Sequence, residues 1–76
     1  MSRGFAMFSE RIKMLRKERN CTQAQIAKEV GLSARGYQDL ELGAVPKGKT
    51  LLSIAEFYEV SIDWLMGRTD KREINR

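Results

Sequence analysis

The stretch QAQIAKEVGLSARGYQDLEL, which runs from Gln23 to Leu42, decides the fold of this chain. It predicts two short helices that meet at a fixed angle. Ala27 stands where the first helix must let the second approach closely. Gly31 stands where the chain turns with a positive φ, which glycine adopts without a Cβ penalty. Apolar side chains are expected to supply the contacts between the two helices and with the core: Ile26, Val30, Leu32, Tyr37 and Leu40.

Two short helices that meet in this way form a helix-turn-helix, a motif that presents its second helix to DNA. The charge of the chain is consistent with a nucleic-acid partner. The formal net charge is +4, and residues 1–20 carry six basic and two acidic side chains. Residues 21–46 are slightly acidic, because they contain two basic side chains and three acidic ones: Lys28 and Arg35, and Glu29, Asp39 and Glu41. The positive charge that would attract DNA therefore lies mostly outside the helix pair.

The composition excludes several classes of protein. One cysteine, Cys21, cannot form an intramolecular disulfide, which fits a cytoplasmic location, and the absence of histidine argues against a structural zinc site. No apolar run is long enough to span a bilayer, and the first residues lack the apolar centre of a secretory signal. No set of side chains suggests catalysis. We therefore expect no enzyme activity, metal, cofactor, small-molecule ligand or membrane contact.

Capping residues mark the ends of the expected helices. Asn20 is suited to a left-handed cap at the end of the first helix, and Thr22 with Gln25 matches the capping box of the next. Ser33 and Ser61 are good N-caps for later helices. The helices are expected over about Phe8–Arg19, Thr22–Val30, Ser33–Leu42, Lys49–Tyr58 and Ile62–Met66.

These elements predict an all-α fold, a compact bundle of five short helices in one domain. No segment alternates with a strand period. We expect residues 1–7 to be an N-terminal arm, residues 8–67 to form the helix-turn-helix domain, and residues 68–76 to be a frayed polar tail or the start of a linker.

With these elements placed, the chain resembles the DNA-binding domain of the phage repressor and Cro family, also called the Xre-type helix-turn-helix family. The segments that carry the match are LRKERNCTQAQIAKEVGLS, LELG and TLLSIAEFYEVSIDWLMG, so the resemblance covers about residues 8–67. It implies the lambda-repressor-like fold and sequence-specific binding of DNA. The chain departs from the family pattern at Gly36, Leu42 and Gly48, and its loop from Gly43 to Pro46 is short.

The resemblance implies a structural ion pair between Arg16 and Glu41. In this family such a pair joins the first helix to the end of the third, with a role in orienting the helix more than in stabilising the fold. The alternative is that both side chains are simply solvated.

Base recognition is expected from the exposed face of the helix that follows Ser33, because Tyr37 and Leu40 point inward. This face contains Ser33, Ala34, Arg35, Gln38 and Asp39. Arg35 is suited to a bidentate contact with guanine, Ala34 to a thymine methyl group and Gln38 to adenine or a phosphate. Asp39 either accepts from cytosine or steers Arg35. The alternative is an ordinary solvated helix face.

Phosphate contacts are expected at two places. Thr22 and Gln23 stand at a helix N-terminus, where free backbone amides favour an anion. Lys47 and Lys49 follow the recognition segment and are suited to the flanking DNA backbone, or else serve only as solubilising charges.

Members of this family usually bind two-fold operators as dimers, with half-sites roughly 34 Å apart. The expected contacts of a homodimer on a pseudo-palindromic operator are Leu52, Ile62 and Trp64, unless Trp64 packs in the core of the monomer.

The function predicted from these patterns is a sequence-specific transcriptional regulator, a repressor of phage type. A second possibility is an antitoxin or another protein-interaction module built on the same bundle. A third is that these residues are the DNA-binding part of a longer repressor whose sensor domain follows Arg76.

Overall fold

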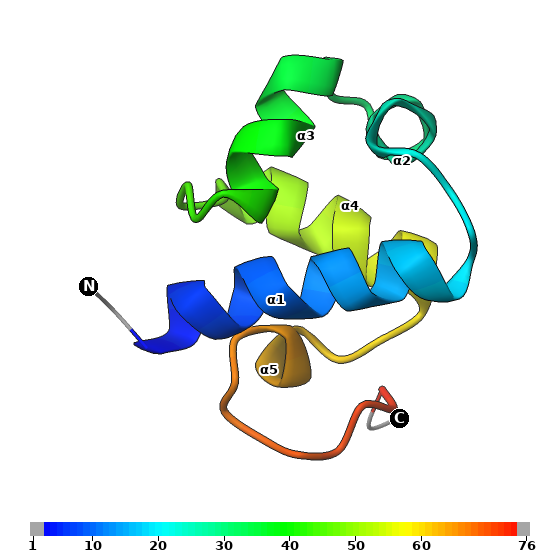
Figure 1. Ribbon diagram of the computed structural model, residues 1–76. Coiled ribbons are helices and arrows are strands. Elements are labelled where there is room, and N and C mark those ends of the chain that lie inside the picture. Colours follow the sequence, from blue (N-terminus) through cyan, green and yellow to red (C-terminus); the bar gives the residue numbers. More distant parts are fainter. Residues whose placement is uncertain (1–2, 75–76) are drawn as a thin grey trace.

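Five helices follow one another along residues 3–74, the part of the chain that the computed structural model describes. They are α1 (Arg3–Glu18), α2 (Gln23–Glu29), α3 (Ala34–Glu41), α4 (Gly48–Tyr58) and α5 (Ile62–Leu65). The described residues contain no strand. Helices α2 and α3 lie on one side of α1, and α5 lies on the other (Figure 1). The predicted all-α, five-helix fold is confirmed.

Helix α1 is longer than the sequence predicted. It begins at Arg3, so residues 3–7 of the expected arm are helical, while residues 1–2 of that arm lie outside the described part of the chain. The prediction placed the start at Phe8, the first residue of the buried apolar stripe. An apolar stripe does not fix the first residue of a helix, and nothing between residues 3 and 8 compels a break, since a single glycine is tolerated in a helix.

The predicted turns around the helix pair are confirmed. Asn20 has a φ of 54° after α1, and Gly31 has a φ of 77° between α2 and α3. The amide of Leu32 donates to the carbonyl of Ala27 at 2.8 Å, which closes the turn. Because only a few residue types adopt positive φ at low cost, these positions fix where the two helices separate.

The predicted N-caps are also confirmed. The Thr22 hydroxyl accepts from the Gln25 amide at 3.1 Å, and the Gln25 side chain accepts from the Thr22 amide at 2.7 Å. Ser33 caps α3 and Ser61 caps α5 through their hydroxyl oxygens. Each cap satisfies a backbone donor that the helix itself leaves unpaired.

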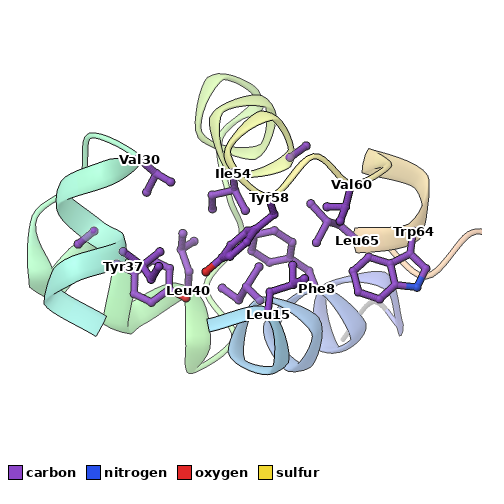
Figure 2. Close-up of a cluster of buried hydrophobic side chains, with 14 residues drawn as sticks. Phe8, Leu15, Val30, Tyr37, Leu40, Ile54, Tyr58, Val60, Trp64 and Leu65 are labelled. Carbon is purple, nitrogen blue, oxygen red and sulfur yellow. The ribbon is translucent and has the colours of Figure 1, made fainter. Parts of the chain in front are cut away.

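The core lies where the five helices converge. Tyr37 of α3 and Phe8 of α1 are fully buried, and Tyr58 of α4 extends toward Tyr37 and Leu40 (Figure 2). This packing holds α3, and α2 with it, against the rest of the domain. The buried hydrophobic residues are Phe8, Ile12, Leu15, Ile26, Ala27, Val30, Tyr37, Leu40, Ile54, Ala55, Tyr58, Val60, Trp64 and Leu65.

Residues 68–74 do not form the frayed tail that the sequence suggested; residues 75–76 of that tail lie outside the described residues. The Ser61 amide donates to the Arg72 carbonyl at 2.9 Å. The Arg72 guanidinium forms two hydrogen bonds with the Glu18 carboxylate, at 2.6 and 3.1 Å, and also lies over the Trp64 ring. A polar segment can therefore dock here, because it carries an arginine that finds both a carboxylate and an aromatic face.

We predict that Gly67→Ala will destabilise the domain by about 2 kcal/mol. Gly67 has a φ of +76°, and a Cβ at this position would lie 2.8 Å from Cγ of Met7 on α1. Thermal unfolding measures the effect. Gly48→Ala is the matched control, because Gly48 has no positive φ and no atom within 4 Å of a Cβ built there. Equal melting temperatures for both variants would contradict the close approach of α5 to α1.

Candidate nucleic-acid interface

The outer face of α3 is polar and open to solvent. Tyr37 and Leu40 are buried, as predicted, which turns Ala34, Arg35 and Gln38 outward. The Arg35 side chain is 83% exposed, and its Nε lies 3.2 Å from Oδ1 of Asp39, one turn along the helix. Exposed pairs of this kind contribute little to stability, so the guanidinium can exchange its carboxylate for another partner.

Ser33 stands at the start of this face and serves as the N-cap of α3. Its hydroxyl oxygen accepts from the Gly36 amide at 3.0 Å, and its own proton is still available for donation. A Cβ on Gly36 would lie 3.1 Å from the same oxygen. Glycine at this unusual position therefore leaves room for the capping hydroxyl, at the cost of some helix propensity.

The Arg16 guanidinium and the Glu41 carboxylate join α1 to the end of α3. Nε of Arg16 lies 2.7 Å from Oε2 of Glu41, and Nη2 lies 3.1 Å from Oε1. A third arginine nitrogen donates to the Cys21 carbonyl at 3.1 Å. The Glu41 side chain is only 2% exposed and that of Arg16 16%. This bidentate geometry fixes both distance and orientation between the helices.

Gln23 belongs to the same cluster, which the sequence did not predict. Its Nε2 donates to Oε1 of Glu41 at 3.1 Å. Gln23 was expected to contact a phosphate. One hydrogen of its side-chain amide is bonded to Glu41 instead, and the second is left for another acceptor. Thr22, the other residue expected there, is exposed, and its hydroxyl is engaged in the capping box.

The cluster keeps Glu41 charged. Burial opposes the charge, but hydrogen bonds from Arg16 and Gln23, the nearby Tyr37 hydroxyl and the charge of Arg16 together lower the pKa of this carboxyl. The Tyr37 hydroxyl faces the carboxylate without a hydrogen bond of ordinary geometry. Burial raises the pKa of the Tyr37 hydroxyl, and it raises the pKa of Tyr58 to about 12. Both tyrosines therefore remain neutral while Glu41 is ionised.

Lys47 and Lys49 stand at the start of α4 and are both exposed. Lys47 is the N-cap residue and makes no capping hydrogen bond with its side chain, and Lys49 lies in the first turn. Cations at a helix N-terminus are disfavoured by the helix dipole. These lysines therefore do not stabilise α4 through its dipole.

Leu52 and Ile62 are exposed, by 48% and 37%, and line a shallow groove of about 330 Å³ between α4, α5 and the C-terminal segment. Ile74 lines the same groove, although nothing in the polar segment around it predicted a role for a lone isoleucine. Val60 forms part of its floor. The groove presents apolar surface to solvent.

Trp64 does not contribute to this surface, so its prediction as an exposed dimer contact is wrong. The residue is only 6% exposed. The Arg11 guanidinium lies 4.6 Å from the centroid of its ring, and that of Arg72 lies 5.3 Å from it. Arg11 also donates to the Trp64 backbone carbonyl. The two arginines cover an indole ring that helical periodicity alone left exposed.

The helix-turn-helix family model matches residues 12–65, which include all of α2, α3 and α4. The chain belongs to this family. Membership confirms the resemblance to the phage repressor and Cro type of helix-turn-helix protein. The described residues contain no group of three or more potential metal ligands and no helix long and apolar enough to cross a membrane.

Curated relatives in this helix-turn-helix family carry regulatory names. A cryptic phage CTXphi transcriptional repressor, RstR, from Vibrio cholerae is 43% identical over 84% of this chain and 60% of its own length. The uncharacterized HTH-type transcriptional regulator YqaE from Bacillus subtilis is 39% identical over 79% of this chain and 53% of its own length. The chain thus spans little more than half of these relatives. No solved structure matches it significantly.

Proposed function

We propose that this chain is a transcriptional repressor module that binds a pseudo-palindromic DNA operator as a homodimer, with α3 in the major groove. The observation that carries the proposal is the outer face of α3, where Arg35 is free of the core while the buried Arg16–Glu41 pair anchors the same helix. A rigidly held helix with an open polar face is what direct readout requires. The repressor name of the Vibrio cholerae relative supports the same function.

Arg35 is the principal base-reading residue in this proposal. Its guanidinium offers two parallel donors to O6 and N7 of guanine, and Asp39 orients the fork until DNA replaces that contact. Ser33, Ala34 and Gln38 complete the face toward neighbouring bases. Gln23 and Thr22, at the start of α2, lie toward the adjacent phosphates.

We predict that neutralising Lys47 and Lys49 will weaken binding to operator and random DNA alike. Each lysine that contacts a phosphate releases a counterion, so Lys47→Gln and Lys49→Gln should each reduce the salt slope of log K by about 1. Fluorescence anisotropy over a series of salt concentrations measures the slope. Lys13→Gln on α1 removes the same charge from a residue with no proposed phosphate contact, so it is the control and should change the slope less than either test variant. An unchanged slope in both test variants would remove the phosphate role.

The second copy is proposed to dock on the groove that Leu52 and Ile62 line. A single module covers a small area of DNA, and a two-fold site is matched by a two-fold protein. The rim of this surface carries both signs of charge, Glu56 and Asp63 beside Lys71, so a rotated copy can place lysine against carboxylate.

We predict that Leu52→Glu and Ile62→Glu will shift the protein toward monomer and weaken operator binding. Both side chains are exposed, so the fold should tolerate the charge, whereas a desolvated carboxylate would disfavour the interface. Analytical ultracentrifugation at micromolar concentration, with and without operator DNA, gives the readout. Met14→Glu, an exposed position on α1, is the control. A wild-type protein that stays monomeric even on operator DNA would refute the dimer.

A further inference from the structure

Leu42 presents a large apolar side chain to solvent at the end of α3. It is 77% exposed, more than any other large hydrophobic residue that the structure describes. Its backbone has φ −89° and ψ −1°, so it continues the helical path of α3 as the C-cap residue. An isolated exposed leucine is ordinary, and the position of this one on the helix is what makes it informative.

Leu42 lies on the same face of α3 as the proposed base-reading residues. Arg35, Asp39 and Leu42 occupy positions i, i+4 and i+7, and a helix places such residues in one row along its surface. The opposite side of α3 is buried through Tyr37 and Leu40. Leu42 is therefore the apolar end of an otherwise polar outer face.

The backbone holds Leu42 in this place. The Ala44 amide donates to the Asp39 carbonyl at 2.9 Å, and the Gly43 amide donates to the Leu40 carbonyl at 3.2 Å. Gly43 has a φ of +112°. Together these bonds form a Schellman-type helix end, after which the loop projects away from the helices (Figure 1). Little backbone entropy therefore remains to be lost when Leu42 meets a partner.

We propose that Leu42 is a specificity-determining residue that contacts the C5-methyl group of a thymine in each half-site. The inference rests on the proposed function, which brings this face of α3 to the major groove. The thymine methyl is the apolar group that the base edges present there, and a leucine can contribute no hydrogen bond to a base or a phosphate. Leu42 lies about 12 Å along the helix from Ala34, so it reaches a different base pair from any methyl group that Ala34 touches.

The test uses an operator selected from a random DNA pool by binding to the wild-type protein. Single thymidines in it are replaced by deoxyuridine, since thymine and uracil differ only by this methyl group. Wild-type protein is expected to bind about fourfold more weakly when one particular thymine in a half-site is replaced. Leu42→Ala should bind the thymine and uracil operators equally at that position, and Leu42→Met should restore the preference. Because Leu42 is exposed, both variants should retain the wild-type melting temperature.

A control variant and the pattern of outcomes separate the possible results. Met14→Ala removes another exposed apolar side chain, on α1, and should leave the response to uracil unchanged at every thymine. If no thymine loses its methyl preference in Leu42→Ala while the protein still selects an operator, the inference is wrong and the proposed function stands. The inference is also wrong if Leu42→Ala changes only the assembly state, which would assign the residue to a protein contact. If the protein selects no DNA sequence at all, the proposed function itself fails.

Discussion

Glu41→Ala is expected to lower the free energy of unfolding by about 3 kcal/mol and the melting temperature by about 12 °C or more. The substitution removes the carboxylate that accepts from Arg16 and Gln23 and leaves a largely buried guanidinium without its charged partner. The loss is a large share of the stability of a domain of this size, roughly 4–11 kcal/mol. Differential scanning calorimetry measures it directly.

Asp39→Ala is the matched control for this result. Asp39 also pairs with an arginine on α3, but that pair is exposed, so its removal should cost less than about 0.5 kcal/mol. Replacing Arg16 and Glu41 together by apolar residues should recover part of the stability, because the unpaired charge is then absent. Glu41→Ala with the melting temperature of the wild type would show that the cluster does not anchor α3.

The same carboxylate predicts how stability depends on pH. Since the folded state lowers the pKa of Glu41 below the ordinary 4.5, its contribution is complete above that value and is lost as the pH falls through the folded pKa. Glu18, paired with Arg72, shifts in the same direction. Urea unfolding between pH 7 and pH 3 should therefore show a shallower pH dependence for Glu41→Gln than for the wild type. Glu29→Gln, at an exposed position of α2, should keep the wild-type dependence.

Arg35→Ala is expected to abolish the preference for one base pair in each half-site. A bidentate arginine–guanine contact discriminates by roughly 1–3 kcal/mol, which corresponds to about 5-fold to 150-fold in affinity per half-site. Random DNA should lose far less, because the remaining lysines and arginines still contact phosphates. The measurement is the ratio of affinities for operator and random DNA at one salt concentration.

The melting temperature serves as the internal control for Arg35→Ala. The side chain is exposed and its pair with Asp39 is weak, so the temperature should shift by only a degree or two. Arg35→Lys keeps the charge but loses the planar fork, and it should recover binding to random DNA better than it recovers specificity. An equal loss on operator and random DNA for Arg35→Ala would assign the residue to a phosphate.

The helices and turns of the fold were predictable because the residues that mark their ends act locally. Thr22 with Gln25, Ser33 and Gly31 each satisfy a cap or a turn within four residues of themselves, and the structure has each one as predicted. The apolar positions of the helix pair repeat at helical spacing, so their buried faces followed directly. The face of α3 that stays exposed followed from the same periodicity, since it is what remains once Tyr37 and Leu40 are buried.

Contacts between distant segments were not predictable in this way. No local pattern around Arg72 predicts its contacts with Glu18 and the Trp64 ring. These contacts hold the C-terminal segment in place and cover the tryptophan. Gln23 matched a phosphate contact by position, but only the folded chain brings Glu41 within 3.1 Å of it. The early start of α1 was not predicted because the helix was placed where the apolar stripe of Phe8, Ile12 and Leu15 begins, and an apolar stripe does not fix the first residue of a helix.

Selection of bound sequences from a random DNA pool tests whether α3 reads a two-fold operator. We expect an enriched inverted repeat whose half-sites lie about one helical turn apart, roughly 34 Å, with a guanine in each half-site that Arg35→Ala no longer selects. Recovery of unrelated sequences, with an affinity that depends on salt but not on sequence, would contradict it.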